Sequence, residues 1–204
     1  MYDGDFINDK FEGNGKFIFK DGRYYVGQWK NDLQHGKGKL YYSNGDIKYD
    51  GDFINGDFDG NGKYIWGDGG YYVGQWKKGL QHGKGKMYYK NGNIEYDGDF
   101  VNGKFEGNGK YIYEHGRYYI GQWKNGLKDG KGKLCHKNGN TKYDGDFING
   151  KFEGKGKYIY EDGRYYIGHW KNGLQHGKGK LYTKNGNIKY DGYFNKGKYI
   201  KNYI

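Results

Sequence analysis

The chain contains no proline, no alanine and only one cysteine among its 204 residues. The single Cys135 excludes an internal disulfide, and sparse cysteine favours a reducing compartment. No apolar run approaches the ~18 residues that a membrane-spanning helix needs. The N-terminal segment MYDGDFINDK is acidic, so no signal peptide is predicted. We therefore expect an intracellular protein.

Glycine and aromatic residues dominate what is present. The chain has 42 Gly and 26 Tyr, aromatic residues make up 21%, and the formal net charge is +11. An ordinary core would draw on more aliphatic residues, so burial must come from large rings over small residues. Lysines and aspartates are interleaved, as at Lys37, Lys39, Asp50 and Asp52. The excess charge favours acidic partners in general, and nucleic acid is not expected.

One tyrosine recurs along the whole chain with gaps that alternate between 23 and 24 residues. A short fixed period is typical of a stacked array in which each unit contacts its neighbours. We predict a single array over residues 1–204, with a partial last unit. The units begin at Tyr2, Tyr25, Tyr49, Tyr72, Tyr96, Tyr119, Tyr143, Tyr166 and Tyr190.

Each unit reads as two short strands. In the second unit, Tyr25, Gly27 and Trp29 alternate with polar or smaller residues, which is the period of a strand. Asn-Gly and Asp-Gly pairs fall between the alternating segments, where hairpins need positive φ angles. We predict an all-β fold: an elongated, single-layer, twisted antiparallel sheet of about 17 short strands, roughly 80 Å long.

The register follows from the turn assignment. A three-residue loop over residues 21–23 places Phe19 opposite Tyr25, and a four-residue loop over residues 44–47 places Lys39 opposite Asp52. The extra residue of the longer units then lies in the closing loop. Gly recurs in these strands to make room for rings that lie flat on the neighbouring strand. A two-residue turn at residues 44–45 would shift the register by two and keep the same faces, and the sequence leaves this open.

The rings are predicted to share one face and to line a groove that binds a partner, because exposed aromatic patches mark interfaces. The predicted groove residues are Tyr25, Trp29, Tyr49, Phe53, Tyr72, Trp76, Tyr96, Phe100, Tyr119, Trp123, Tyr143, Phe147, Tyr166 and Trp170. We expect the Phe and Leu residues of the inner loops to fold back over this face. They are Phe11, Leu33, Phe58, Leu80, Phe105, Leu127, Phe152 and Leu174.

No catalytic residue, metal site or cofactor is predicted. His35, His82 and His176 share one repeat position, and copies four strands apart are ~19 Å apart, too far to share a metal ion. The Asp-Gly-Asp segments place their carboxylates on a strand beside Lys, whereas a calcium site needs them to converge from one loop.

The segments YVGQWKNDLQHGKG (residues 25–38) and YIGHWKNGLQHGKG (residues 166–179) resemble the membrane occupation and recognition nexus (MORN) repeat. The segments at residues 72–85 and 119–132 carry the same pattern, with Asp129 in place of His in the latter. The acidic units that begin at Tyr2, Tyr49, Tyr96 and Tyr143 match more loosely, with Phe for Trp and Glu or Asp for His. The resemblance implies a β-hairpin solenoid without intrinsic catalysis, of the kind found in cytoskeletal, ciliary and membrane-junction scaffolds, including the axonemal radial spoke.

The resemblance therefore implies a structural scaffold or adaptor in a larger assembly, with a cytoskeletal or ciliary location. We expect its partners to be other proteins of that assembly, a second MORN array among them. The alternative is a peripheral membrane or phosphoinositide-binding module that uses the Lys and aromatic rows, since such rows also suit anionic lipid.

Overall fold

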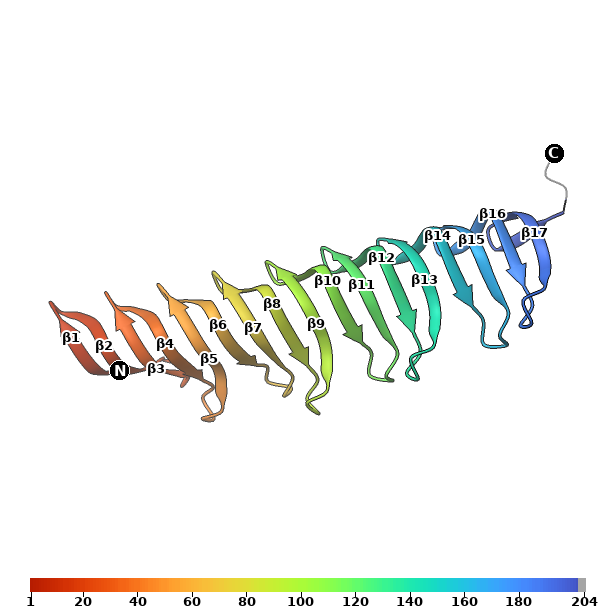
Figure 1. Ribbon diagram of the computed structural model, residues 1–204. Helices are drawn as coiled ribbons and strands as arrows, with labels where there is room; N and C mark the ends of the chain where they lie inside the picture. The colour runs from red at the N-terminus through yellow and green to blue at the C-terminus, as the bar shows by residue number, and fades with distance from the viewer. Residues whose placement is uncertain (202–204) are drawn as a thin grey trace. The chain divides into compact units, whose positions relative to one another are not determined.

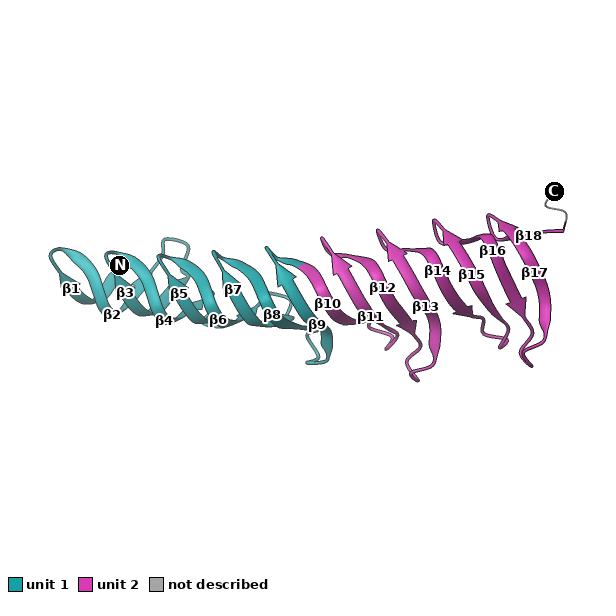
Figure 2. Ribbon diagram, turned by 45° about the horizontal axis from the view of Figure 1, so that its top comes forward, with its two compact units in different colours: residues 1–104 teal, residues 105–204 magenta. Residues whose placement is uncertain are grey.

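The computed structural model describes residues 1–201 and is all-β: 18 strands pair antiparallel (Figure 1). None of the described residues forms a helix, so none of them belongs to a helix that could cross a membrane. The chain forms two compact units, residues 1–104 and 105–204 (Figure 2). Within each unit, strands consecutive in sequence lie side by side in one open layer. The prediction of one array over residues 1–204 stays a prediction.

Unit 1 contains β1 (Tyr2–Ile7), β2 (Lys10–Ile18), β3 (Tyr24–Lys30), β4 (Leu33–Tyr41), β5 (Ile47–Ile54), β6 (Asp57–Ile65), β7 (Tyr71–Lys77), β8 (Leu80–Tyr88) and β9 (Ile94–Val101). Strand β10 (Lys104–Ile112) begins at the boundary, and unit 2 continues with β11 (Tyr118–Lys124), β12 (Leu127–Cys135), β13 (Thr141–Ile148), β14 (Lys151–Ile159), β15 (Tyr165–Lys171), β16 (Leu174–Tyr182), β17 (Ile188–Asn195) and β18 (Lys198–Ile200).

The inner turns, which join the two strands of each unit, are tight and need positive φ at two successive residues. Asn55 and Gly56 have φ angles of 50° and 88°. Asn and Gly tolerate this region better than other residues, which explains the recurring Asn-Gly pair. The Gly56 amide also donates to the carbonyl of Gln34 at 2.9 Å, so each turn is tied to the preceding unit.

The preferred register is wrong by two residues, although the predicted faces are correct, and the observed pairing is the one that the alternative turn at residues 44–45 would give. Phe17, not Phe19, lies opposite Tyr25, and Lys39 pairs with Asp50, not with Asp52. The reason is a longer closing loop. The Phe19 amide donates to the Arg23 carbonyl at 2.8 Å, so residues 19–23 all lie beyond the last strand pair.

The extra residue of the longer units lies in a β-bulge and not in the closing loop. The loop after β4 closes like the loop after β2, with the Tyr42 amide donating to the Asp46 carbonyl at 2.9 Å. In β5, Tyr49 lies opposite Leu40 while Ile47 lies opposite Tyr41, which leaves Lys48 unmatched. A bulge of this kind absorbs one residue and keeps the later side chains on their faces.

Glycines form a row across neighbouring strands, and the recurring Tyr rings lie on this row. Gly27 lies opposite Gly38, and Gly38 lies opposite Gly51. A Cβ added at Gly27 would lie 2.5 Å from both the Tyr25 hydroxyl and the Gly38 Cα. The prediction that Gly makes room for flat rings is therefore confirmed, with the correction that Gly faces Gly and the ring comes from two residues earlier in the strand.

The inner-loop prediction holds for Phe and fails for Leu. The Phe58 ring stacks on Tyr49 with centroids 3.9 Å apart, and Phe11 stacks on Tyr2 in the same way at 3.8 Å. Leu33 points to solvent and is 45% exposed. The two residue types do not share a position: Phe11 lies opposite Phe6, whereas Gln34 takes the matching place opposite Trp29, and Leu33 lies one residue earlier, on the other face of the strand. The four Phe residues are half-buried and the four Leu residues are exposed: Phe11, Phe58, Phe105, Phe152, and Leu33, Leu80, Leu127, Leu174.

Candidate functional site

The structure brings the predicted groove rings together on one face, but it buries them. Their Tyr side chains are 0% exposed, their Phe side chains 1–2% and their Trp side chains 6–7%. They form the core of each unit and offer little contact area in the free chain. This burial corrects the expectation of an open groove. The fourteen are Tyr25, Trp29, Tyr49, Phe53, Tyr72, Trp76, Tyr96, Phe100, Tyr119, Trp123, Tyr143, Phe147, Tyr166 and Trp170. Their role in partner binding stays a prediction.

Hydrogen bonds and ring packing hold these side chains in place. The Tyr25 hydroxyl donates to the Gln28 carbonyl at 2.9 Å, and the Trp29 indole donates to the Gly15 carbonyl at 3.2 Å. The Tyr25 ring meets Trp29 and Phe53 edge to face, with centroids 5.1 and 5.0 Å apart. Such pairs stabilise a core beyond the area they bury.

Burial also keeps the Tyr hydroxyls protonated. It raises the pKa of Tyr25 well above its usual range, against the opposing hydrogen bond to the Gln28 carbonyl. The pKa of Tyr166 is raised to about 12, by burial first and by nearby Tyr160 second. The core Tyr residues therefore serve as neutral structural groups.

A second set of apolar side chains lies on the same face, nearer the closing loops, and is only half-buried. We call this set the apolar stripe. In unit 1 it consists of Phe17, Phe19, Leu40, Tyr42, Tyr64, Trp66, Met87 and Tyr89. Phe17 contacts the core at Trp29, and Trp66 contacts Tyr64, with ring centroids 6.0 and 5.6 Å apart. The stripe residues therefore contact the buried core on one side and remain partly exposed to solvent on the other.

Two cations accompany the stripe in unit 1. The Lys48 ammonium lies 5.4 Å from the centroid of the Tyr42 ring and 5.8 Å from that of Tyr64, and Arg23 lies over Phe19 at 5.8 Å. Partial burial, and then the charge of Arg23, lower the pKa of Lys48. The β-bulge puts Lys48 there, and sequence reasoning missed it because it placed the extra residue in the loop.

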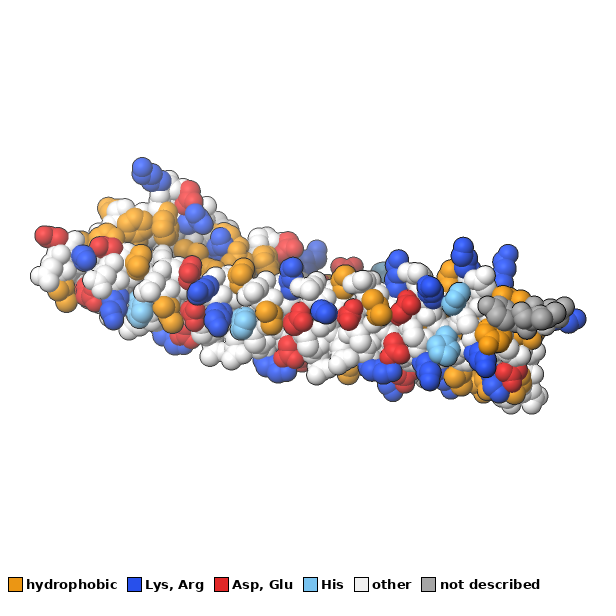
Figure 3. Space-filling view, turned by 90° about the horizontal axis from the view of Figure 1, so that it is seen from above, with side chains coloured by type: hydrophobic (Ala, Val, Ile, Leu, Met, Phe, Trp, Pro, Cys, Tyr) orange, Lys and Arg blue, Asp and Glu red, His pale blue; other side chains and the backbone are white. Residues whose placement is uncertain are grey.

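The matching positions of unit 2 are more polar. His136 and Thr183 stand where unit 1 has Tyr42 and Tyr89. The Tyr113 hydroxyl accepts a hydrogen bond from the Lys128 ammonium at 2.5 Å. On the face that Figure 3 shows, hydrophobic side chains gather at the β1 end of unit 1, and Lys and Arg side chains gather at the far end of unit 2.

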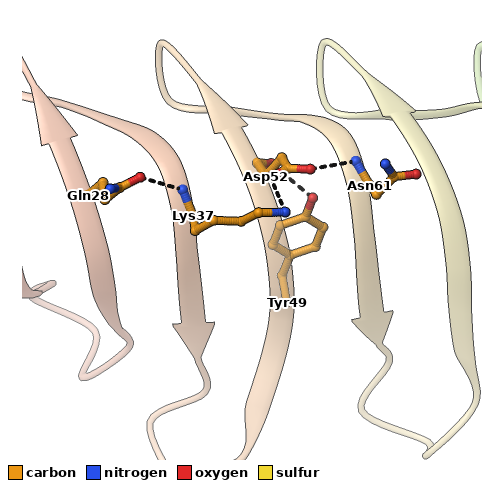
Figure 4. A network of polar contacts seen from close by, with 5 residues as sticks. All are labelled: Gln28, Lys37, Tyr49, Asp52 and Asn61. Carbon is orange, nitrogen blue, oxygen red and sulfur yellow. Dashed lines mark hydrogen bonds and ion pairs between the residues drawn. The ribbon is translucent and has the colours of Figure 1, made fainter.

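The opposite face, which we call the outer face, carries ion pairs and side chains that accept hydrogen bonds from backbone amides. Asp52 accepts a hydrogen bond from the Asn61 amide at 2.9 Å and pairs with the Lys37 ammonium at 2.5 Å (Figure 4). Gln28 accepts from the Lys37 amide at 2.9 Å in the same way. These side chains accept hydrogen bonds from amides that have no backbone partner, because the strand pairing is interrupted by a β-bulge between Gly27 and Trp29 and between Gly51 and Phe53. Burial alone would raise the pKa of Asp52, but Lys37 and the Asn61 amide lower it below its usual range.

The acidic residues before the positive-φ Gly at the inner end of a strand bond the inner turn of the following unit. Glu12 accepts from the Asn31 amide at 2.9 Å, and Asp129 accepts from the Asn149 amide at 3.2 Å. His35 and His82 occupy the same repeat position, and their Nδ1 atoms are buried without a hydrogen-bond partner. The acidic residues at this position therefore support the inner turn of the following unit, and the Nδ1 atoms of the two histidines make no such bond.

Comparison with known proteins identifies one family, and the solved structures that match include one of weak likeness. No curated protein sequence matches the chain. A mutant of the TCP10 domain of Danio rerio CPAP matches with 12% identity, over 89% of this chain and 90% of that chain, at a TM-score of 0.29. A TM-score of 0.29 carries no argument about fold or function.

The sequence profile of the MORN repeat matches eight consecutive segments. They are residues 2–22, 25–47, 49–71, 72–94, 96–116, 119–141, 143–163 and 166–188. Each segment begins at one of the recurring Tyr residues from which the repeat was predicted. The matches cover most of the chain, and the protein belongs to the MORN repeat family.

Proposed function

We propose that the protein is a non-catalytic scaffold that binds other proteins through the apolar stripe of unit 1. The observation that carries this proposal is a set of half-buried rings beside a fully buried core. Exposed apolar patches of this kind mark interaction surfaces in proteins. MORN repeats in general are non-enzymatic modules for protein interaction or membrane association, which is consistent with this role.

The stripe favours a partner with mixed apolar and acidic side chains. Trp66, Tyr42 and Phe19 offer aromatic area, which is enriched at the centres of interfaces. Lys48 lies over the Tyr42 ring and would attract carboxylates at the rim, whereas Arg23 pairs with Asp21 at 2.7 Å. An acidic amphipathic segment of another protein meets both conditions. We place the assembly in the cytoskeleton or a cilium, as the family resemblance implies.

The lipid alternative is weaker over unit 1 because four of the outer-face lysines there are paired. Lys37, Lys39, Lys84 and Lys86 each pair with an Asp at 2.5 to 3.0 Å. Paired lysines offer less net charge to an anionic surface than free ones do. The observation favours a protein partner over a lipid bilayer.

Two matched double variants test the proposal. Trp66→Ser with Met87→Ser removes apolar area from the stripe. Val26→Ser with Val73→Ser removes exposed apolar side chains from the outer face, where Val26 is 39% exposed and Val73 42%. Proximity labelling in cells with quantitative mass spectrometry compares the partners of the wild type and both variants, and sedimentation velocity measures self-association.

We expect the stripe variant to lose the specific partners that the wild type and the outer-face variant keep. Circular dichroism checks that both variants fold. A stripe variant that keeps every partner contradicts the proposal, as does an outer-face variant that alone loses them. Loss of a dimer in the stripe variant alone identifies a second copy of this chain as the partner.

A further inference from the structure

The outer face of unit 2 departs from the repeat at a lysine that loses its carboxylate. In the earlier copies this lysine pairs with an Asp of the next strand, as Lys131 does with Asp146 at 2.5 Å. In the last copy Lys178 lies opposite Tyr193 instead. The Lys178 ammonium lies 5.7 Å from the centroid of the Tyr193 ring. Lys178 therefore has no acidic partner in the part of the chain that the structure describes.

A second departure lies directly beside the first. His169 occupies the position of Gln28, Gln75 and Gln122. At Gly130 an added Cβ would overlap with the Gln122 side chain, whereas at Gly177 the nearest atom is the Cβ of His169, 3.7 Å away. The His169 ring instead places Nδ1 3.2 Å from the Lys178 carbonyl. The exchange of Gln for His opens space over Gly177.

A hollow of about 480 Å³ lies at these two positions, within unit 2. Its apolar part consists of Ile167 and the glycine backbone around Gly168, and Tyr193 stands at one side. Lys155, Lys178 and His169 also line it. The volume suits a small-molecule ligand, for which sites of roughly 300–1,000 Å³ are usual.

Electrostatics select an anionic occupant for the hollow. Asp191 is the one acidic side chain in its lining, and it pairs with Lys180 at 2.8 Å. After Tyr166 the sequence has one acidic residue, Asp191, and eight lysines: Lys171, Lys178, Lys180, Lys184, Lys189, Lys196, Lys198 and Lys201. A surface with this excess concentrates anions near the hollow.

We infer that this hollow binds a nucleoside polyphosphate. The base would lie on Ile167 and the glycine backbone against the Tyr193 ring, since aromatic side chains stack on nucleobases. The phosphates would lie at Lys155 and Lys178, whose ammonium groups act as point charges for phosphate oxygens. The inference does not depend on the apolar stripe, which lies on the other face of the sheet.

Calorimetric titration of the full chain with ATP at low ionic strength tests the inference. Inorganic tripolyphosphate and adenosine, titrated separately, measure what each half of the ligand contributes. Tyr193→Asp restores the carboxylate of the other copies beside Lys178, and His169→Gln restores the side chain that fills the space over Gly177. Gln122→His makes the reverse exchange one pair of units earlier and serves as the matched control.

We expect ATP to bind about tenfold or more tightly than either tripolyphosphate or adenosine. We expect Tyr193→Asp and His169→Gln each to weaken ATP binding by about tenfold or more, and Gln122→His to leave it unchanged. Both exchanges install residues that other copies carry, so the fold is retained, and circular dichroism checks this. Absence of ATP binding, equal binding of tripolyphosphate, or wild-type affinity in both hollow variants overturns the inference.

Discussion

Replacement of Gly38 by Ala tests the packing of Tyr rings on the glycine row. Gly38 lies under the Tyr25 ring, and an added Cβ would overlap with the hydroxyl and with Cε2 and Cζ of that ring. Tyr25 is 0% exposed, and its ring packs edge to face against Trp29 and Phe53, which limit how far it can shift. Either the ring leaves its site or the strands β3 and β4 separate locally.

The expected loss of stability in Gly38→Ala follows from the interactions that the Tyr25 ring loses. Burial of one Tyr ring is worth about 2–3 kcal/mol, its hydrogen bond to the Gln28 carbonyl about 1 kcal/mol, and its edge contacts with Trp29 and Phe53 about 1 kcal/mol. If the backbone yields instead, overpacking costs about 1–3 kcal/mol. We expect Gly38→Ala to destabilise the protein by about 2–4 kcal/mol.

Gly67→Ala is the matched control. No atom lies within 4 Å of a Cβ built at Gly67, and its φ is not in the positive range. We expect a change within about 0.5 kcal/mol. Urea unfolding followed by Tyr and Trp fluorescence gives both values, and hydrogen exchange shows whether the loss is confined to strands β3 to β5. Equal stability of the two variants would falsify the proposed role of the glycine row.

Three further predictions concern the core and its titration. Trp76→Ala, which removes a ring that is 7% exposed, should cost about 3–5 kcal/mol in urea unfolding, whereas Trp66→Ser on the stripe should cost far less. Because folding raises the pKa of Tyr166 to about 12, its contribution to stability is complete below the unfolded pKa of ~10 and is lost as pH rises toward 12; the tyrosinate absorbance that the wild type shows in excess of a Tyr166→Phe variant should therefore appear together with unfolding, and appearance of that difference in the folded chain near pH 10 contradicts this. Because folding lowers the pKa of Asp52, its contribution is present above the unfolded value of ~3.9 and is lost as pH falls through the folded value; Asp52→Asn, which keeps an acceptor for the Asn61 amide, should flatten this acid dependence in urea titrations, and an unchanged slope counts against it.

The strands and their faces could be predicted from the sequence, but the register could not. The alternation of Tyr25, Gly27 and Trp29 fixes which side chains share a face, whatever the loop length. The register depends on how the loop closes, and Asp21-Gly22 suits several closures. One extra residue lengthens the spacing between successive Tyr residues by the same amount whether it lies in a loop or in a β-bulge. The spacing alone therefore could not place Lys48.

The sequence predicted which rings share a face, yet not which of them are covered. Coverage depends on position along the strand: Tyr49 is sealed by Phe58 stacked at 3.9 Å, while Tyr42, nearer the closing loop, has no such cover. Comparison among the copies carries a usable signal. The buried position is Tyr in every unit, whereas the stripe position of Tyr42 is filled by Tyr89, His136 and Thr183 in later copies. A ring that can be exchanged for Thr is not part of the core.

The same comparison separates neutral departures from departures with a local role. In an array, each copy meets the same demands of packing, so a residue repeated in all copies serves the array as a whole. Cys135 replaces the Tyr of other copies but remains buried at 5% exposure, so the packing demand is still met.

Tyr193 and His169 are departures of another kind. Tyr193 replaces the Asp that pairs with the equivalent lysine in the other copies, and His169 replaces the Gln whose side chain lies over the glycine that corresponds to Gly177. Both changes expose groups that the other copies cover. The two exchanged residues line the same hollow, and one of the exchanges leaves Lys178 without the carboxylate that the other copies supply. A demand specific to this place on the outer face accounts for both, and a bound anion supplies the charge that Asp supplies elsewhere.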